Sequence, residues 1–197
     1  MLVPERVELV RLRLGLTKIG FSESLGIDRK TLQRFDKDGY DLPQSCVAQL
    51  IELSGYPEGF FKDRAKIEYP SASGVSFRSL RSLTAASRNS AMAAGALAFI
   101  FDDYINSEYT LPTHDLSTEV KSVSPAKAAL RLRAQWGIGL RPIGNLINLL
   151  EAKGIRIFSL AEETRHLDAY SLWRNDKPYI FLNTLKTAEI CNSRSSH

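Results

Sequence analysis

Apolar and polar positions in the first third of the chain follow the spacing of short helices. Apolar residues recur three or four positions apart, which places them on one face of an α-helix. Pro4 suits the first turn of one such helix and Pro43 that of another, while Gly26 and Gly55 follow apolar runs and favour helix ends. The pattern predicts a unit of five helices over residues 1–65.

A linker and a longer helix are predicted next. Residues 66–74, KIEYPSASG, combine Pro, Ser and Gly and are typical of a linker. A helical block follows over residues 75–109, in which Thr84 can cap a helix. Residues 106–124 are polar and irregular and are predicted to form a loop. Four small residues of the helical block would let its backbone approach a neighbour closely: Ala91, Ala94, Gly95 and Ala98.

Two helices and three strands are predicted after this loop. Ser124 would cap the first helix, with Ala129, Leu132 and Trp136 on its inner face, and Pro142 would open the second. In that second helix the apolar residues at helical spacing are Ile143, Leu146, Ile147 and Leu150. The pattern then changes to the β-rich runs IRIFSL, AYSLW and PYIFL, and the Asn-Asp pair between the last two suits a hairpin turn.

These elements predict a mainly α fold with a small α+β second domain. The predicted domains are a helical domain over residues 1–65 and a second domain over residues 75–197, joined by the linker. The longest apolar run, residues 91–101, is about half of the roughly 20 residues that a bilayer span requires. No membrane association is therefore expected.

Composition adds little to this picture. The 197 residues carry a net charge of +4, which fits a nucleic-acid partner but is also explained by solubility alone. The two cysteines, Cys46 and Cys191, lie far apart and predict neither a disulfide framework nor a zinc ribbon. A reducing cytoplasm is the expected location.

The stretch LTKIGFSESLGIDRKTLQRFDKD, residues 16–38, predicts two short helices joined by a tight turn. Thr17 would cap the first helix and Asp28 the second, each by accepting a hydrogen bond from a free backbone N–H. Gly26 suits the left-handed backbone that ends the first helix. The residues expected to face the core are Phe21, Leu25, Leu32 and Phe35.

The outer face of the second helix carries side chains that could read DNA. Arg and Lys can donate to guanine O6 and N7, and Gln can form two hydrogen bonds with adenine. Thr17 and Lys18, at the start of the first helix, would meet phosphates together with the backbone N–H groups there. The alternative is that this is the ordinary polar face of a small helical domain. The predicted base-reading residues are Arg29, Lys30, Gln33 and Arg34.

Residues 7–61 resemble a helix-turn-helix domain of the XRE type, the class of the phage Cro and lambda-type repressors. The resemblance implies a five-helix lambda-repressor-like domain whose second motif helix enters the major groove of double-stranded DNA. It also implies a homodimer on two half-sites about one helical turn apart. Two residues depart from the family pattern. Ser22 stands where Ala is common, and Gly20 should weaken its helix by about 1 kcal/mol relative to Ala.

The second domain resembles the ImmA/IrrE family of metallo-endopeptidases over most of residues 75–189. The resemblance runs through VSFRSLRSLTAASRNSAMAAGALAF, LRLRAQWGIGLRPIGNLINLLEAKGIRIFSL and DAYSLWRNDKPYIFLNT. Family members bind zinc through an HExxH helix, in which the Glu activates a water molecule. No HExxH is present in this sequence, and His197 falls near the position of the first zinc His. We therefore expect a truncated domain with no catalytic residues, metal or other cofactor, zinc being expected in a full-length relative.

Other residues do not replace the missing motif. Glu163 and His166 have a Glu-x-x-His spacing, but di-metal sites of this kind need further carboxylates from facing helices. His114 stands alone in a predicted loop.

The interpretation that we prefer is a sequence-specific DNA-binding transcriptional regulator with a catalytically incomplete ImmA/IrrE-like domain. The alternative is a zinc endopeptidase regulator that cleaves a repressor, with its HExxH helix missing from this chain. A third hypothesis is a protein-interaction module, in which the second domain binds a sensor, a repressor or an antitoxin-like protein and the first domain only dimerises. A fourth is a second domain that is poorly folded because apolar residues 179–182 are exposed on a strand.

Overall fold

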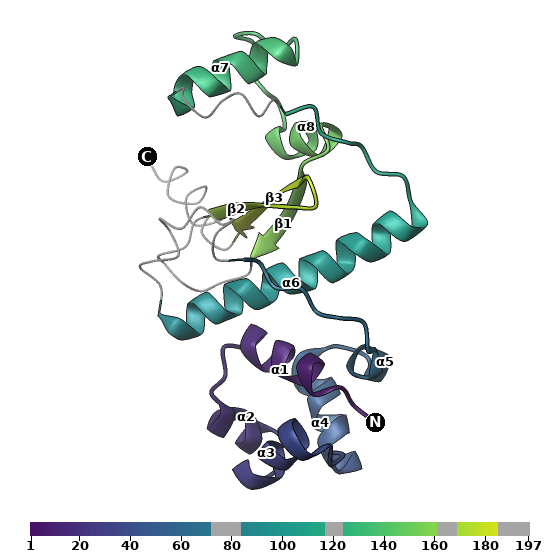
Figure 1. Cartoon of the computed structure of the whole chain (residues 1–197). Coiled ribbons are helices and arrows are strands. Elements are labelled where there is room, and N and C mark those ends of the chain that lie inside the picture. The colour runs from purple at the N-terminus through teal and green to yellow at the C-terminus, as the bar shows by residue number, and fades with distance from the viewer. Residues whose placement is uncertain (72–83, 117–123, 161–168, 185–197) are drawn as a thin grey trace.

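The computed structural model describes residues 1–71, 84–116, 124–160 and 169–184 (Figure 1). Within these ranges the chain is mainly helical, with one small mixed sheet. The coarse fold class predicted from the sequence is therefore confirmed. The helices are α1 (Pro4–Arg13), α2 (Lys18–Ser24), α3 (Arg29–Asp38), α4 (Gln44–Ser54), α5 (Glu58–Lys62), α6 (Ala85–Glu108), α7 (Pro125–Gln135) and α8 (Leu146–Ala152). The strands are β1 (Arg156–Leu160), β2 (Ala169–Arg174) and β3 (Lys177–Asn183).

Helices α1 to α5 pack around one apolar core in the N-terminal unit, as predicted. Gly26 and Gly55 have φ angles of 66° and 73°, the left-handed conformation that glycine adopts without strain at helix ends. Residues 66–71 leave this unit as coil, and the rest of the predicted linker lies outside the described residues. The most deeply buried apolar side chains of the core are Val7, Val10, Phe21, Leu25, Phe35, Leu50 and Phe61.

The sheet has the strand order β1-β3-β2, with β1 parallel and β2 antiparallel to β3. Asn175 and Asp176 connect β2 to β3 with φ angles of 49° and 58°. Two consecutive positive φ angles are typical of the tight type I′ hairpin turn. The hairpin predicted from this Asn-Asp pair is confirmed.

The central strand of the sheet is β3, and its apolar side chains are covered. Tyr179 and Phe181 are buried on the face that packs against α6, where the Phe99 and Tyr179 rings meet edge to face at 5.1 Å between centroids. The expectation that residues 179–182 are exposed is therefore wrong for these two rings. Sequence reasoning did not anticipate that α6 would lie across the sheet and supply the cover.

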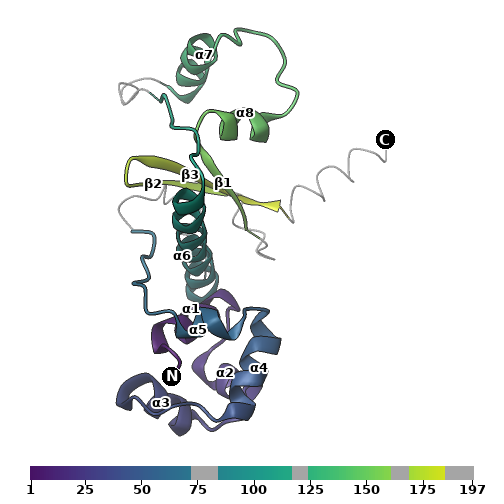
Figure 2. The same ribbon diagram turned by 90° about the vertical axis from the view of Figure 1, so that its right-hand side faces the viewer.

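Helix α6 forms a layer between the sheet and the N-terminal unit (Figure 2). On one side Leu9 of α1 packs between Ala93 and Ala96 of α6. On the sheet side a Cβ at Gly95 would lie 2.4 Å from Pro70 Cγ, so this glycine leaves room for the coil that follows α5. The predicted close approach of a neighbour to the small residues of α6 is confirmed.

Helices α7 and α8 differ from the prediction. Ser124 precedes α7, but its side chain makes no capping hydrogen bond. Ala129, which was predicted to face inward, is exposed, since none of the described residues covers α7 closely enough to bury a side chain. Helix α8 begins at Leu146 and not at Pro142, because the Asn145 side chain caps it by accepting from the Asn148 backbone N–H at 3.0 Å. The exposed apolar residues of α8 are Leu146 and Ile147, at 54% and 45%.

The predicted loop also starts later than expected, because α6 continues to Glu108. Among the described residues, no helix combines the length and the apolar character that crossing a bilayer requires.

Candidate nucleic-acid interface

Helices α2 and α3 are both held at their N-terminal ends by side-chain caps. Thr17 Oγ1 accepts from the Gly20 backbone N–H at 3.1 Å, and Asp28 Oδ1 accepts from the Thr31 backbone N–H at 2.6 Å. The hydrogen bond from the Thr31 backbone is the main cause that lowers the pKa of Asp28, so the cap is ionised at neutral pH. Both caps confirm the helix starts predicted from the sequence.

Helix α3 is fixed in orientation by two buried side chains. Leu32 and Phe35 are 3% and 1% exposed and belong to the core of the N-terminal unit. The turn before α3 is closed by a hydrogen bond from the Ile27 N–H to the Ser22 carbonyl oxygen at 3.0 Å. Because this face of α3 is anchored in the core, the opposite face of the helix is exposed to solvent.

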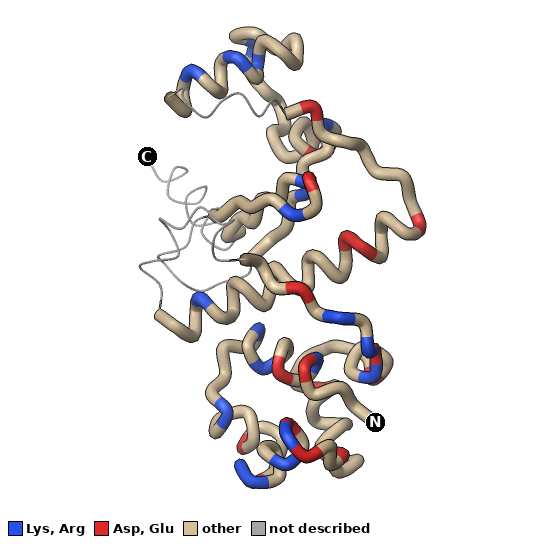
Figure 3. The backbone as a smooth tube through the Cα atoms, in the orientation of Figure 1, with Lys and Arg blue, Asp and Glu red and all other residues tan. Residues whose placement is uncertain are grey.

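The four predicted base-reading residues all lie on the exposed face of α3. Figure 3 shows basic positions in blue along this part of the N-terminal unit, with acidic positions in red beside them. Arg34 places its guanidinium over the Tyr40 ring at 5.9 Å, a weak cation–π contact with an exposed aromatic that sequence reasoning did not include. The four residues are Arg29, Lys30, Gln33 and Arg34.

A groove of about 240 Å³, hereafter the α3 groove, runs between the start of α2 and the face of α3. Arg29, Gln33 and Lys37 follow one another at intervals of four along the helix, so their side chains lie in one row. Two of the predicted base-reading residues therefore lie in the same groove as the predicted phosphate contact. The residues that line the α3 groove are Lys18, Arg29, Leu32, Gln33, Asp36 and Lys37.

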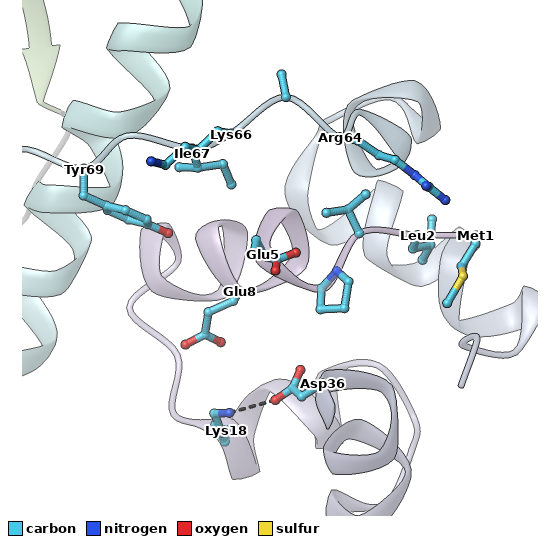
Figure 4. A pocket seen from close by; sticks show the side chains of 13 residues that line it. Met1, Leu2, Glu5, Glu8, Lys18, Asp36, Arg64, Lys66, Ile67 and Tyr69 are labelled. Atoms are coloured by element: carbon cyan, nitrogen blue, oxygen red, sulfur yellow. Dashed lines mark hydrogen bonds and ion pairs between the residues drawn. The ribbon is translucent and has the colours of Figure 1, made fainter. Parts of the chain in front are cut away.

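Lys18 has a partner that the sequence did not indicate. Its Nζ lies 2.7 Å from Asp36 Oδ2, in an ion pair that joins α2 to α3 (Figure 4). Eighteen positions separate the two residues in the sequence, and they occupy different helices, so no local spacing could have revealed the pair. The cation predicted to meet a phosphate is thus held by a carboxylate in the free protein.

Both departures from the helix-turn-helix pattern are accommodated. Ser22 is buried, and its hydroxyl donates to the Ile19 carbonyl oxygen at 2.8 Å, so the extra polar group is satisfied. Gly20 donates its N–H to the Thr17 cap.

Lys18 and Asp36 also line a larger cavity of about 800 Å³ (Figure 4). This cavity is formed by the N-terminal segment, α1 and the coil after α5. The same two residues, Lys18 and Asp36, also line the α3 groove. The remaining residues that line the cavity are Met1, Leu2, Val3, Pro4, Glu5, Glu8, Arg64, Ala65, Lys66, Ile67 and Tyr69.

A second charged cluster, also missed from the sequence, lies between α6 and the sheet. Asp102 is 2% exposed, and its carboxylate accepts from the Tyr179 hydroxyl at 2.6 Å and from Arg156 Nε at 2.9 Å. Burial opposes ionisation of Asp102, but the Tyr179 hydrogen bond and the charges of Lys177 and Arg156 outweigh it and lower the pKa. Burial, followed by the bond to Asp102, raises the pKa of Tyr179. The cluster joins three elements of the fold and is structural in character.

The described residues do not fit a zinc site. No three His, Cys, Asp or Glu side chains come together in the described ranges. His114 Nδ1 accepts from the Leu116 N–H at 3.2 Å, and its Nε2 lies 2.7 Å from the Asp176 carbonyl oxygen. The other residues considered for metal binding, Glu163, His166 and His197, lie outside the described residues, as does Cys191.

Comparison with known proteins does not place the chain in a family. Neither protein-family models, nor curated proteins, nor solved structures give a match to it.

Proposed function

We propose that this protein is a sequence-specific DNA-binding transcriptional regulator, with α2 and α3 as a helix-turn-helix of the XRE type. The observation that carries the proposal is the division of α3 into a buried and an exposed face. Leu32 and Phe35 anchor the helix, while the side chains exposed on its other faces include two Arg, two Lys and one Gln. A capped, rigidly anchored helix with such side chains is suited to the major groove.

In this proposal α3 reads bases and the start of α2 contacts the DNA backbone. Arg29 and Gln33 lie one turn apart in the α3 groove, so they would meet neighbouring base pairs. The capped end of α2 offers free backbone N–H groups and the Lys18 ammonium to phosphates. Phosphate contacts fix the register of the protein on DNA, and the α3 side chains select the sequence.

The second unit is proposed to be a regulatory domain, in keeping with its resemblance to ImmA/IrrE proteins. Its packing against the DNA-binding unit supports this role. Leu9 of α1 lies between Ala93 and Ala96 of α6, and Arg13 Nη1 lies 3.1 Å from Ser90 Oγ. A change in the second unit would therefore be transmitted to α1, which packs behind the helix pair.

The experiment selects a binding site from random duplexes and measures affinity by fluorescence anisotropy. Arg29→Ala should cost about 1–3 kcal/mol on the selected site and relax the preference at one base position. Lys18→Ala should weaken the selected and a scrambled duplex alike, because a phosphate contact carries no sequence information. Arg64→Ala removes the same charge from the exposed coil after α5 and serves as the matched control.

Equal losses on the selected and scrambled duplexes for Arg29→Ala would contradict the assignment of the α3 face. Binding that does not fall with increasing salt would contradict the proposed function, since phosphate contacts release counterions.

A further inference from the structure

The Lys18–Asp36 pair occupies the position at which the proposed DNA backbone contact has to form. Asp36 is the carboxylate among the six residues that line the α3 groove, and the others include three cations. Its Oδ2 holds the Lys18 ammonium at 2.7 Å, with 54% of the Lys18 side chain and 21% of the Asp36 side chain exposed. Figure 4 shows this pair bridging the two helices below α1.

The Lys18–Asp36 pair adds only a small amount to the stability of the fold. Ion pairs that are open to water add little to folding, because water screens the charges and both side chains lose freedom. The two helices are already held together by the buried Phe21, Leu25, Leu32 and Phe35. Asp36 also sets the charge of the α3 groove and the position of Lys18.

A phosphate at the start of α2 would compete with Asp36 for the same ammonium group. When Lys18 moves to the phosphate, the Asp36 carboxylate is left without its partner and faces a negatively charged backbone. Both effects oppose binding, and both are independent of base sequence because they involve phosphates.

We propose that Asp36 is a positioning residue that holds Lys18 away from the DNA backbone in the free protein and so lowers affinity for all DNA sequences. This inference rests on the proposed DNA-binding function. It assigns a role to a residue of α3 that does not read bases. The base-reading face would then account for a larger share of the binding free energy on a specific site.

The transfer of Lys18 from Asp36 to a phosphate affects how strongly DNA affinity depends on salt concentration. In the wild-type protein, transfer of Lys18 to a phosphate releases a DNA counterion, but the freed Asp36 carboxylate attracts a cation from solution. The two changes offset each other. In an Asp36→Asn variant the second change is absent, so the dependence of log K on log salt becomes steeper.

The test compares the full-length protein with Asp36→Asn on a selected and a scrambled duplex, over a range of salt concentrations. Affinity for both duplexes should rise by about two- to fivefold, the range expected from releasing an exposed ion pair. The salt slope should steepen by up to about one unit. Glu58→Gln is the matched control, since Glu58 pairs with Lys62 at 2.8 Å on the surface of α5 and the net charge change is the same.

Each remaining outcome overturns the inference in a distinguishable way. If Asp36→Asn behaves like Glu58→Gln, the effect is one of net charge alone. If it loses affinity while its thermal unfolding is unchanged, the ion pair orients α3 for binding instead of restraining Lys18. If wild type and both variants all fail to bind DNA at low salt, the proposed function falls and this inference falls with it.

Discussion

The buried Asp102 and its exposed neighbour Asp103 give a test of which charges hold the second unit together. Both lie on α6 and both form ion pairs with residues of the sheet. Asp102 is 2% exposed and bonds Tyr179 and Arg156, whereas the Asp103 side chain is 56% exposed and pairs with Arg174. The two Asp→Asn substitutions therefore make the same chemical change at two carboxylates that differ in burial.

Asp102→Asn should lower the free energy of unfolding by about 2–3 kcal/mol. Breaking a fully buried ion pair typically costs about 3–5 kcal/mol, because a buried charge is left uncompensated. The expected loss is smaller here because Asn can still accept one hydrogen bond and because the Lys177 side chain is 35% exposed, so water can solvate it. Asp103→Asn should cost at most about 1 kcal/mol, because Asp103 is exposed and because Arg174, which is 10% exposed, keeps its ion pair with Glu68 at 2.8 Å.

Urea unfolding followed by tryptophan fluorescence measures these losses. The chain has two tryptophans, Trp136 and Trp173, and both lie in the second unit, so the signal reports the unfolding of that unit. A loss for Asp103→Asn as large as that for Asp102→Asn would refute the reasoning, since burial would then not decide the cost. A loss below about 1 kcal/mol for Asp102→Asn would also refute it.

Two further predictions concern the same unit. The pKa of Asp102 lies below its ordinary value of 3.8, so the unfolded chain binds this proton at a higher pH than the native protein. The free energy of unfolding should therefore fall as pH drops from about 4 through the lowered pKa, and acid titration of Asp102→Asn should lack this part of the slope. Gly95→Ala should cost about 1–3 kcal/mol in urea unfolding, because the new Cβ would lie 2.4 Å from Pro70 Cγ. Gly144→Ala, whose Cβ meets nothing within 4 Å, should change stability by less than about 0.5 kcal/mol; an equal loss would count against the role of Pro70.

Features governed by neighbouring residues were predictable from the sequence. The caps at Thr17 and Asp28 depend on a side chain and a backbone N–H three positions apart, and the glycine at position 26 has a local conformational role. The Asn175–Asp176 turn is likewise set by two residues that tolerate a positive φ. These signals located α2, α3 and the β2–β3 hairpin.

Features that depend on distant partners were not predictable in the same way. Ala129 lies at a helical spacing that suits an inner face, yet spacing does not say whether another element will cover that face. The parallel pairing of β1 with β3 has no local signal either. For the candidate site, the exposed face of α3 was predicted, but the partner of Lys18 was not, because Asp36 reaches it from another helix.

Buried charge was the other weak point of sequence reasoning. Arg6 lies between Glu5 and Val7 on α1, and arginine is usually assigned to the surface. In the structure it is 1% exposed, bonds Asp63 Oδ2 at 2.5 Å and lies over the Phe60 ring. Its partner is 57 positions away in the sequence, so nothing near Arg6 indicates that it is buried.

The packing of Leu9 between two alanines of α6 limits how this protein can be rearranged in evolution. A helical unit that is exchanged freely between proteins needs a polar surface towards its neighbour. Here the neighbour completes the burial of Leu9, and small side chains at positions 93 and 96 are what make the fit possible. A gene fusion that gave the first five helices a different companion would have to supply an equally small-residue helix or replace Leu9 with a polar residue.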